Sequence, residues 1–182
     1  MTIAGIDQSL TGTAITIIEN NVERFFLLSS KKTKNTKCPS IDYTRRLIEI
    51  RNDVKKVLDQ YKPSYICMEG MAFGAKGSVV FELGGLSHLL RELYFNEDIK
   101  FIIAPPTIIK KYATGKGNAD KMMMILEAMK RGANIPFFKK IEKQEMFDDN
   151  VCDSYFMASF MRDYLNGKAI EFEDKIEKSW EL

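Results

Sequence analysis

The sequence predicts an α/β fold in which a mixed five-stranded sheet carries helices on both faces. The first 29 residues contain three segments rich in β-branched and aromatic residues, joined by short turns, which is typical of an antiparallel meander. Two further apolar runs each follow a helical pattern, as in right-handed crossovers between parallel strands. A chain of 182 residues can bury one sizeable core. We therefore expect one domain over residues 1–167 and a charged tail over residues 168–182.

The predicted meander places an acidic residue at the end of its first strand. This apolar strand ends at Asp7, and a turn over residues 9–12 leads to a second strand that ends near Ile18. Two asparagines then form the turn to a third strand over residues 22–29. A buried aspartate is costly unless it is paired, hydrogen-bonded or bound to a metal ion. The charge of Asp7 therefore needs a partner elsewhere in the chain.

The first crossover brings a second acid to the same place. Its helix begins near Ser40, the expected N-cap, and ends near Lys62, with apolar residues at spacings of three and four. The next strand covers residues 64–69 and ends on Glu69. Because parallel neighbours place their C-terminal ends side by side, Asp7 and Glu69 should meet at one edge of the sheet.

The second crossover contains an unusual pair of glycines. Its helix covers residues 78–95 and leads to the fifth strand over residues 99–104. Gly84 and Gly85 lie in mid-helix, where each glycine costs about 1 kcal/mol relative to alanine. Close approach of another backbone would explain them. The residues alone leave open whether the approaching backbone belongs to a second copy of the chain or to the sheet of the same chain.

The rest of the chain is predicted to be helical, with loops between the helices. We expect a short helix or turn over residues 107–113, a helix capped by Asn118, a lysine-rich loop, and a last long helix over residues 148–165. In the last helix, Asp149 and Asp153 are four residues apart and share a face.

Four carboxylates brought together predict a metal site. Each acid alone has another explanation, such as capping a turn, pairing with a lysine or complementing a helix dipole. Together they would repel one another unless cations lie between them. Oxygen ligands without histidine or thiolate favour Mg²⁺ or Mn²⁺. Two such ions about 3.5–4 Å apart can activate a water for phosphodiester hydrolysis, so the predicted chemistry is phosphoryl transfer to water.

The composition excludes several other kinds of site. The single histidine, His88, argues against multi-histidine metal sites and a Ser-His-Asp triad. The three cysteines are far apart, which argues against a thiolate zinc site or a disulfide framework. No apolar run approaches the roughly 20 residues needed to cross a membrane. We therefore expect a cytoplasmic protein with no membrane partner.

The charge distribution is compatible with a phosphate-rich partner. The formal net charge is only +2. Lysines nevertheless cluster at residues 31–37, 110–121 and 139–143. Such clusters suit nucleic acid, although a lysine-rich loop is more often a solvated surface.

Four motifs, taken in order, resemble a known family. They are Gly-Ile-Asp7-Gln-Ser-Leu-Thr-Gly12, Ile-Cys-Met-Glu69, Gly-Lys-Gly-Asn-Ala-Asp-Lys121 and Asp-Asp-Asn-Val-Cys-Asp153. As a set they resemble the RuvC family of Holliday junction resolvases, and its bacteriophage members in particular. The resemblance covers residues 2–166 and implies a ribonuclease-H-like fold, a homodimer, and paired nicks in four-way DNA junctions that leave 5′-phosphate and 3′-hydroxyl ends. It also implies two Mg²⁺ or Mn²⁺ ions per site, other branched DNA such as three-way junctions and replication forks as substrates, and, for a phage protein, the host cytoplasm.

The resemblance implies roles for particular residues. The metal ligands would be Asp7, Glu69, Asp153 and either Asn150 or Asp149, of which we choose Asp149 because a carboxylate preserves the charge that faces the metal. Lys121 would be catalytic. The DNA contacts would be Phe73, Lys76, Lys110, Lys111, Lys116 and Lys121. The dimer contacts would be Leu83, Gly84, Gly85 and Leu86.

Two other functions remain open from the sequence. Asn150 and the near-neutral charge would also suit a junction-binding protein with weak or no cleavage. A strand-end aspartate before a Ser/Thr/Gly turn also occurs in kinase-like ATPases, but the chain is too short for the two domains of that fold.

Overall fold

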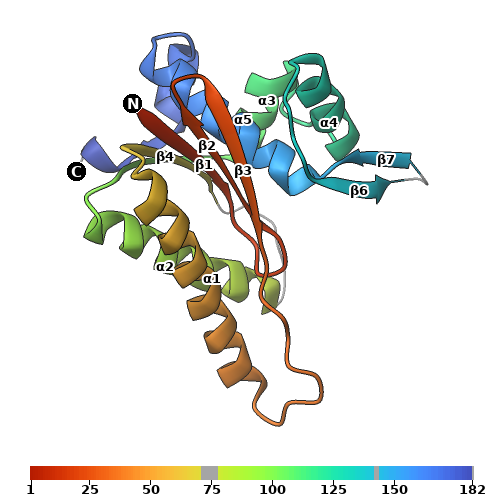
Figure 1. Ribbon diagram of the computed structural model, residues 1–182. Helices are drawn as coiled ribbons and strands as arrows, with labels where there is room; N and C mark the ends of the chain where they lie inside the picture. The colour runs from red at the N-terminus through yellow and green to blue at the C-terminus, as the bar shows by residue number, and fades with distance from the viewer. Residues whose placement is uncertain (71–77, 142–143, 182) are drawn as a thin grey trace.

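The structure, a computed structural model, describes residues 1–70, 78–141 and 144–181, and is built on one mixed sheet (Figure 1). Its strands lie in the order β3-β2-β1-β4-β5-β8. They are β1 (Thr2–Asp7), β2 (Thr13–Glu19), β3 (Val22–Leu28), β4 (Tyr65–Glu69), β5 (Lys100–Ala104) and β8 (Glu177–Lys178). The antiparallel β1-β2-β3 meander and the parallel β1-β4-β5 pairing are as predicted.

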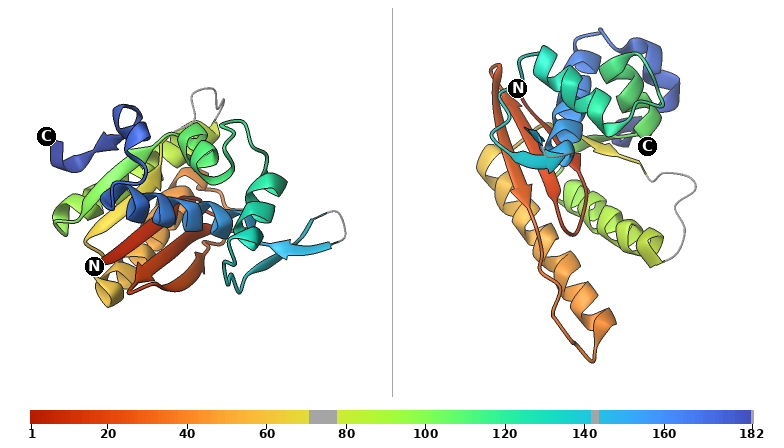
Figure 2. Two further views of the ribbon diagram at one scale, coloured as in Figure 1. Left: turned by 90° about the horizontal axis from the view of Figure 1, so that it is seen from above. Right: turned by 90° about the vertical axis from the view of Figure 1, so that its right-hand side faces the viewer.

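Helices cover both faces of this sheet, as expected. Helices α1 (Pro39–Tyr61) and α2 (Ser78–Asn96) lie on one face, and α3 (Pro106–Thr114), α4 (Lys121–Lys130) and α5 (Asp149–Leu165) lie on the other (Figures 1 and 2). Each layer encloses its own apolar cluster against the sheet. Both faces of β1 are therefore buried, which explains its nearly unbroken apolar sequence.

Helix α5 packs very closely on the middle of the sheet. A Cβ atom at Gly5 would lie 2.1 Å from the backbone oxygen of Ser154 and 2.3 Å from the backbone nitrogen of Ala158. The hydroxyls of Thr16 and Ser154 form a buried 2.8 Å hydrogen bond between β2 and α5. This packing places the first turns of α5 at the C-terminal ends of β1 and β4.

The start of α1 differs from the prediction. Ser40 is not the N-cap: the helix begins at Pro39, after Cys38, and no side chain caps it. The preceding loop is held instead by Asp42, which accepts hydrogen bonds from the backbone and the hydroxyl of Thr33. Proline at the first helical position needs no hydrogen-bond partner for a backbone N–H, which accounts for an N-cap two residues earlier than predicted. The end is as predicted, with Lys62 in the left-handed conformation.

Gly85 is explained by packing within the chain. A Cβ atom there would lie 3.3 Å from Leu47 Cδ1 and 3.4 Å from the hydroxyl oxygen of Tyr43, both on α1. The close neighbour of this glycine is therefore the other helix of the same layer rather than the sheet. Leu86 is fully buried in the same apolar cluster.

Two predictions for the second half of the chain are wrong. The N-cap of α4 is Asp120, which accepts a 2.9 Å hydrogen bond from the backbone N–H of Met123, and not Asn118. The lysine-rich loop is a hairpin of β6 (Phe138–Ile141) and β7 (Gln144–Phe147), in which Phe138 pairs with Phe147. A cross-strand aromatic pair stabilises such a short hairpin.

The segment expected to be a charged tail packs on the sheet. It contains the 3₁₀ helix η1 (Ile170–Lys175), strand β8 and the 3₁₀ helix η2 (Ser179–Glu181). Strand β8 pairs antiparallel with β5, so the sheet has six strands rather than five. Phe172 and Ile176 are buried, and the Trp180 ring meets Tyr65 edge-on at 5.9 Å. Apolar residues spaced between charges therefore anchor this segment.

None of the helices in the described part of the chain combines the length and apolar character needed to cross a membrane.

Candidate active site

Four acidic side chains are placed near one edge of the sheet by three elements. Asp7 ends β1 and Glu69 ends β4, and the parallel pairing of Ile6 with Met68 brings these strand ends together. Asp149 and Asp153 lie in the first two turns of α5, which crosses the same strands. The ends of β1 and β4 and the start of α5 therefore lie at one edge of the sheet, as the predicted topology implies.

The charges of these acids act on one another. Burial raises the pKa of Asp7 well above its ordinary value, and the charges of Asp153, Glu69 and Asp149 raise it further. Burial, followed by the charges of Glu69 and Asp149, raises the pKa of Asp153 to about 7. The pKa of Glu69 is also raised, mainly by burial. Negative charge at this edge is thus only partly compensated by the protein itself.

Asp149 differs from the other three acids because two lysines hold it. Lys121 Nζ donates to Asp149 Oδ2, and Lys139 Nζ donates to Asp149 Oδ1 at 2.8 Å. Burial raises the pKa of Asp149, but these hydrogen bonds and charges outweigh it and leave the pKa below its ordinary value. Asp149 is therefore the acid whose charge is already balanced.

Asn150 is occupied elsewhere. Its side-chain Nδ2 donates a 2.9 Å hydrogen bond to the backbone oxygen of Gly12, in the turn between β1 and β2. A Cβ atom at Gly12 would lie only 2.6 Å from this nitrogen, so the contact favours glycine in the turn. Of the two residues left open by the sequence, Asp149 lies toward the other acids and Asn150 fixes the neighbouring turn. That Asp149 rather than Asn150 binds metal stays a prediction.

The turn after Asp7 ties the two acidic strand ends together. Gln8 Nε2 donates to the backbone oxygen of Glu69 at 3.3 Å. The backbone N–H of Ser9 donates to the hydroxyl of Thr13 at 3.0 Å, which closes the turn. The other amide atom of Gln8, Oε1, is buried and has no hydrogen-bond partner among the described residues. Gln8 therefore ties the end of β1 to the backbone at the end of β4.

The donor chemistry of the site fits a hard divalent cation. All four side chains offer carboxylate oxygens, the ligands that Mg²⁺ and Mn²⁺ prefer. In the part of the chain that the structure describes, however, no group of three or more acidic, histidine or cysteine side chains is arranged to hold a metal ion as it stands. Within this set, both oxygens of Asp149 are engaged by lysines.

The other predicted site residues have different outcomes. Lys110 lowers the pKa of both Glu69 and Asp153, so its charge lies within electrostatic range of the acids. Lys111 and Lys116 are exposed, and the structure gives neither side chain a contact with the described acids. Phe73 and Lys76 lie outside the described residues, as does the side chain of Leu83.

The sequence analysis missed two residues that contact or cap this site. Asp148 was not among the predicted site residues, yet it is almost fully buried and caps α5 by accepting hydrogen bonds from the backbone N–H groups of Asn150 and Val151. Lys139 was seen only as part of a basic cluster, yet it contacts both Asp148 and Asp149. The β6-β7 hairpin, which the sequence analysis did not predict, places this lysine beside the first turn of α5.

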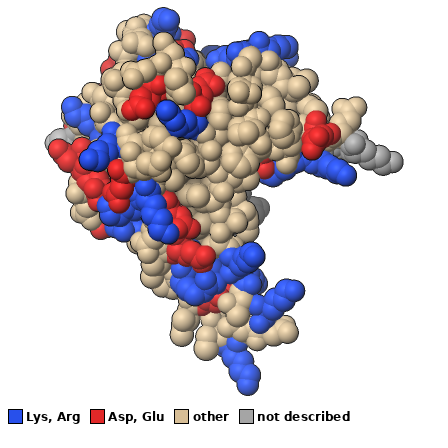
Figure 3. All heavy atoms as spheres, in the orientation of Figure 1, with Lys and Arg blue, Asp and Glu red and all other residues tan. Residues whose placement is uncertain are grey.

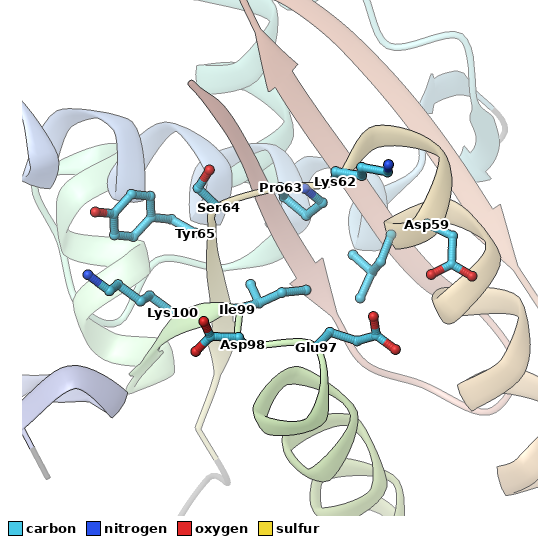
Figure 4. A pocket seen from close by; sticks show the side chains of 10 residues that line it. Asp59, Lys62, Pro63, Ser64, Tyr65, Glu97, Asp98, Ile99 and Lys100 are labelled. Carbon is cyan, nitrogen blue, oxygen red and sulfur yellow. The ribbon is translucent and has the colours of Figure 1, made fainter.

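Basic side chains flank the edge that carries the acids. Lysines and arginines gather over the lower end of α1 with its preceding loop and along the β6-β7 hairpin, and the surface is hollowed between them (Figure 3). A cavity of about 670 Å³ lies at the other end of β4 and β5, lined by residues including Lys62, Tyr65, Asp98 and Lys100 (Figure 4). It contains none of the four acids, so this cavity is not the candidate site.

Comparison with known proteins gives consistent matches. The family model described as crossover junction endodeoxyribonuclease RuvC matches residues 3–135. A curated relative, the crossover junction endodeoxyribonuclease RuvC of Chloroherpeton thalassium, is 30% identical over 80 residues, which is 44% of this chain and 43% of the relative. The match thus spans less than half of that relative's length.

Solved structures share the fold. Thermus thermophilus RuvC in complex with a Holliday junction substrate superposes with a TM-score of 0.66 at 17% identity, covering 92% of this chain and 97% of that one. The yeast mitochondrial Holliday junction resolvase Ydc2 superposes with a TM-score of 0.58 at 15% identity, covering 94% and 83%. At these identities the likeness establishes the architecture of the sheet and its helices.

Proposed function

Because this chain belongs to the RuvC family of crossover junction endodeoxyribonucleases, with the ribonuclease-H-like fold of that family, we propose that it is a metal-dependent endonuclease that cuts four-way DNA junctions. The observation that carries the proposal is the coupled set of acids at the sheet edge. Asp7, Glu69 and Asp153 all have raised pKa values in one small region, so the site is built to receive positive charge.

Asp7, Glu69, Asp149 and Asp153 would hold the metal ions. When bound, two Mg²⁺ or Mn²⁺ ions supply an activated water and stabilise the leaving 3′ oxygen, which gives 5′-phosphate and 3′-hydroxyl ends. The fixed geometry of α5 on β1 keeps the helical and strand acids in register. Gln8 holds the end of β4 through the backbone oxygen of Glu69. The chain thus provides a rigid frame for the reaction.

Basic residues would hold the scissile strand. Lys121 lies at the start of α4 beside Asp149, and Lys110 lies within electrostatic range of Glu69 and Asp153. Both can pair with phosphate oxygens and neutralise charge that develops during cleavage. We assign the outer contacts to Lys111, Lys116, Phe73 and Lys76, as the family resemblance implies.

Paired nicks in a four-way junction require two active sites, so we propose a homodimer. The segment over residues 83–86 of α2 remains its proposed contact. Leu86 faces the core of its own chain, so the contact would use the opposite side of the helix. Three-way junctions and replication forks are proposed as further substrates. The bacteriophage origin and the host cytoplasm stay predictions from the resemblance.

Cleavage of a synthetic four-way junction in Mg²⁺ tests the proposal. The intact protein should produce symmetrically paired nicks, and Asp7→Asn should reduce the rate at least 100-fold, because it removes a ligand charge from the site. Absence of nicks from the intact protein, with Asp7→Asn behaving identically, would contradict it. Tight, salt-sensitive junction binding without nicks in Mn²⁺ would instead identify a binding protein.

The same assay separates Asp149 from Asn150. Asp149→Asn should lower the cleavage rate by about 100-fold or more, because it removes a charged metal ligand. Asn150→Ala should cost less than about tenfold, since it removes only a hydrogen bond to the turn at Gly12. The reverse order of effects would show that Asn150 faces the metal ions.

A further inference from the structure

The β6-β7 hairpin brings a lysine to the acids from an unexpected direction. The hairpin leaves the body beside the start of α5 and projects away from it (Figures 1 and 2). Its base is closed by the backbone N–H of Asp148, which donates to the backbone oxygen of Phe137 at 2.9 Å, and by the Phe138–Phe147 ring pair. Lys139 lies on β6 next to this base, so its side chain can reach the first turn of α5.

Lys139 contacts two different carboxylates. Its Nζ lies 3.0 Å from Asp148 Oδ2 and 2.8 Å from Asp149 Oδ1. The two aspartate side chains are 2% and 9% exposed, whereas the lysine side chain is 42% exposed. The lysine therefore approaches buried acids from the solvent side, where DNA would also approach.

The carboxylates of Asp148 and Asp149 have different roles. Asp148 also accepts from the N–H groups of Asn150 and Val151, so it is bound into the helix cap and keeps its place whatever else binds. Asp149 has no such tie to the backbone, and its other oxygen is taken by Lys121. Lys139 thus contacts Asp148, which the helix cap holds in place, and Asp149, which the cap does not hold.

A divalent cation at Asp149 competes with the two ammonium groups that engage its oxygens. Withdrawal of one lysine would remove a positive charge that opposes the metal ion directly. Lys121, with a side chain 76% exposed, has no second carboxylate in contact among the described residues, whereas Lys139 keeps its pair with Asp148 when it leaves Asp149. The exposed ammonium of Lys139 would then face the solvent side of the site and could pair with a backbone phosphate.

Resting on the function proposed above, we propose that Lys139 is a positioning residue that holds Asp149 in the free protein and exchanges it for a DNA phosphate when metal and substrate bind. The hairpin thereby couples strand binding to completion of the metal site. This assigns a specific role to an element that lies outside residues 3–135, the part that the family model matches.

The metal affinity of the free protein tests this exchange. Mn²⁺ binding without DNA is measured by calorimetry for the wild type, Lys139→Gln, Lys139→Arg and Lys140→Gln. Lys139→Gln should bind Mn²⁺ more tightly, on the order of tenfold, because one competing charge is removed. Lys140 is the matched control, since it carries the same charge on the adjacent position of the same strand and pairs across the hairpin with Glu145 rather than with the acids of the site. Lys140→Gln and Lys139→Arg should stay within about twofold of the wild type.

Junction cleavage supplies the second measurement. Lys139→Gln should reach half-maximal cleavage at a lower Mg²⁺ concentration, yet require more junction DNA for half-saturation than Lys140→Gln. If Lys139→Gln and Lys140→Gln bind Mn²⁺ with equal affinity while the wild-type protein cleaves junctions, the exchange is overturned and the proposed function stands. A wild-type protein that neither binds Mn²⁺ nor cleaves would overturn the proposed function and the exchange with it.

Discussion

At the scale of single residues, the site is defined by uneven charge compensation. Asp149 has two lysine partners, whereas burial raises the pKa of Asp7, Glu69 and Asp153. Carboxylates that are buried together without cations destabilise the charged form of each. The site therefore costs stability in the metal-free protein, as is common where a fold is shaped for function.

This cost makes stability depend on pH in a defined direction. The pKa of Asp153 is raised from 3.8 to about 7 in the folded protein, so its protonated form favours folding. The resulting stability is fully present below the unfolded-state pKa near 3.8 and is lost as pH rises through about 7. Without divalent metal, Asp153→Asn should therefore stabilise the protein by roughly 2–4 kcal/mol at pH 8, and the gain should shrink as pH falls toward 4.

Urea unfolding at several pH values measures this effect. Asp174→Asn is the control, because Asp174 is an exposed acid in the C-terminal segment, and it should change the free energy of unfolding by less than about 0.5 kcal/mol. A gain from Asp153→Asn that does not vary with pH would show that charge repulsion is not its cause.

At the scale of elements, the contact of α5 with β1 aligns the acids. The helix approaches so closely at Gly5 that even a methyl group would meet its backbone. Asp7 is two residues further along the strand, and Asp153 precedes Ser154 in the helix. The close contact at Gly5 therefore helps to set the spacing between the strand acids and the helix acids.

Gly5→Ala should be strongly destabilising. The added methyl group would meet backbone atoms, which cannot rotate away, so we expect a loss of about 3 kcal/mol or more in the free energy of unfolding. Gly132→Ala is a useful comparison, because Gly132 has a φ of 71° but open space around it, and only about 1 kcal/mol of backbone strain is expected there. A similar small loss at both positions in urea unfolding would disprove the close packing of α5.

At the scale of the whole molecule, the C-terminal segment completes the sheet. Strand β8 covers the edge of β5, and Phe172 packs against Phe160 of α5 with ring centroids 5.9 Å apart. An uncovered sheet edge is a template for pairing with other chains. The segment therefore belongs to the folded unit that carries the site.

Phe172→Ala tests this role. It should lower the free energy of unfolding by about 3 kcal/mol, because a buried aromatic ring is lost. Ile170→Ala, at a residue 55% exposed in the same 3₁₀ helix, should cost less than about 1 kcal/mol. Equal small losses would mean that the segment is the dispensable tail that its composition suggests.

The sequence alone determined the fold class, the order of the five main strands and the two strand-end acids. These features depend on local patterns, namely the alternation of apolar residues, the helical spacing and the turn residues, which each segment carries by itself. The ordered motifs determined the family in the same way. The predicted meeting of Asp7 and Glu69 followed from topology alone, since parallel neighbours end at one edge.

Only the tertiary structure decided how the charges at that edge are distributed. The spacing of residues in the sequence does not show that Asn150 turns away from the acids, because this depends on a hydrogen bond to Gly12, 138 residues away. The spacing also does not show that Lys139 contacts Asp148 and Asp149, because this depends on a short hairpin held by two aromatic rings. The same holds for β8, whose two residues are too few to show a pattern. Contacts between distant segments depend on how the layers pack, and a linear sequence does not display that packing.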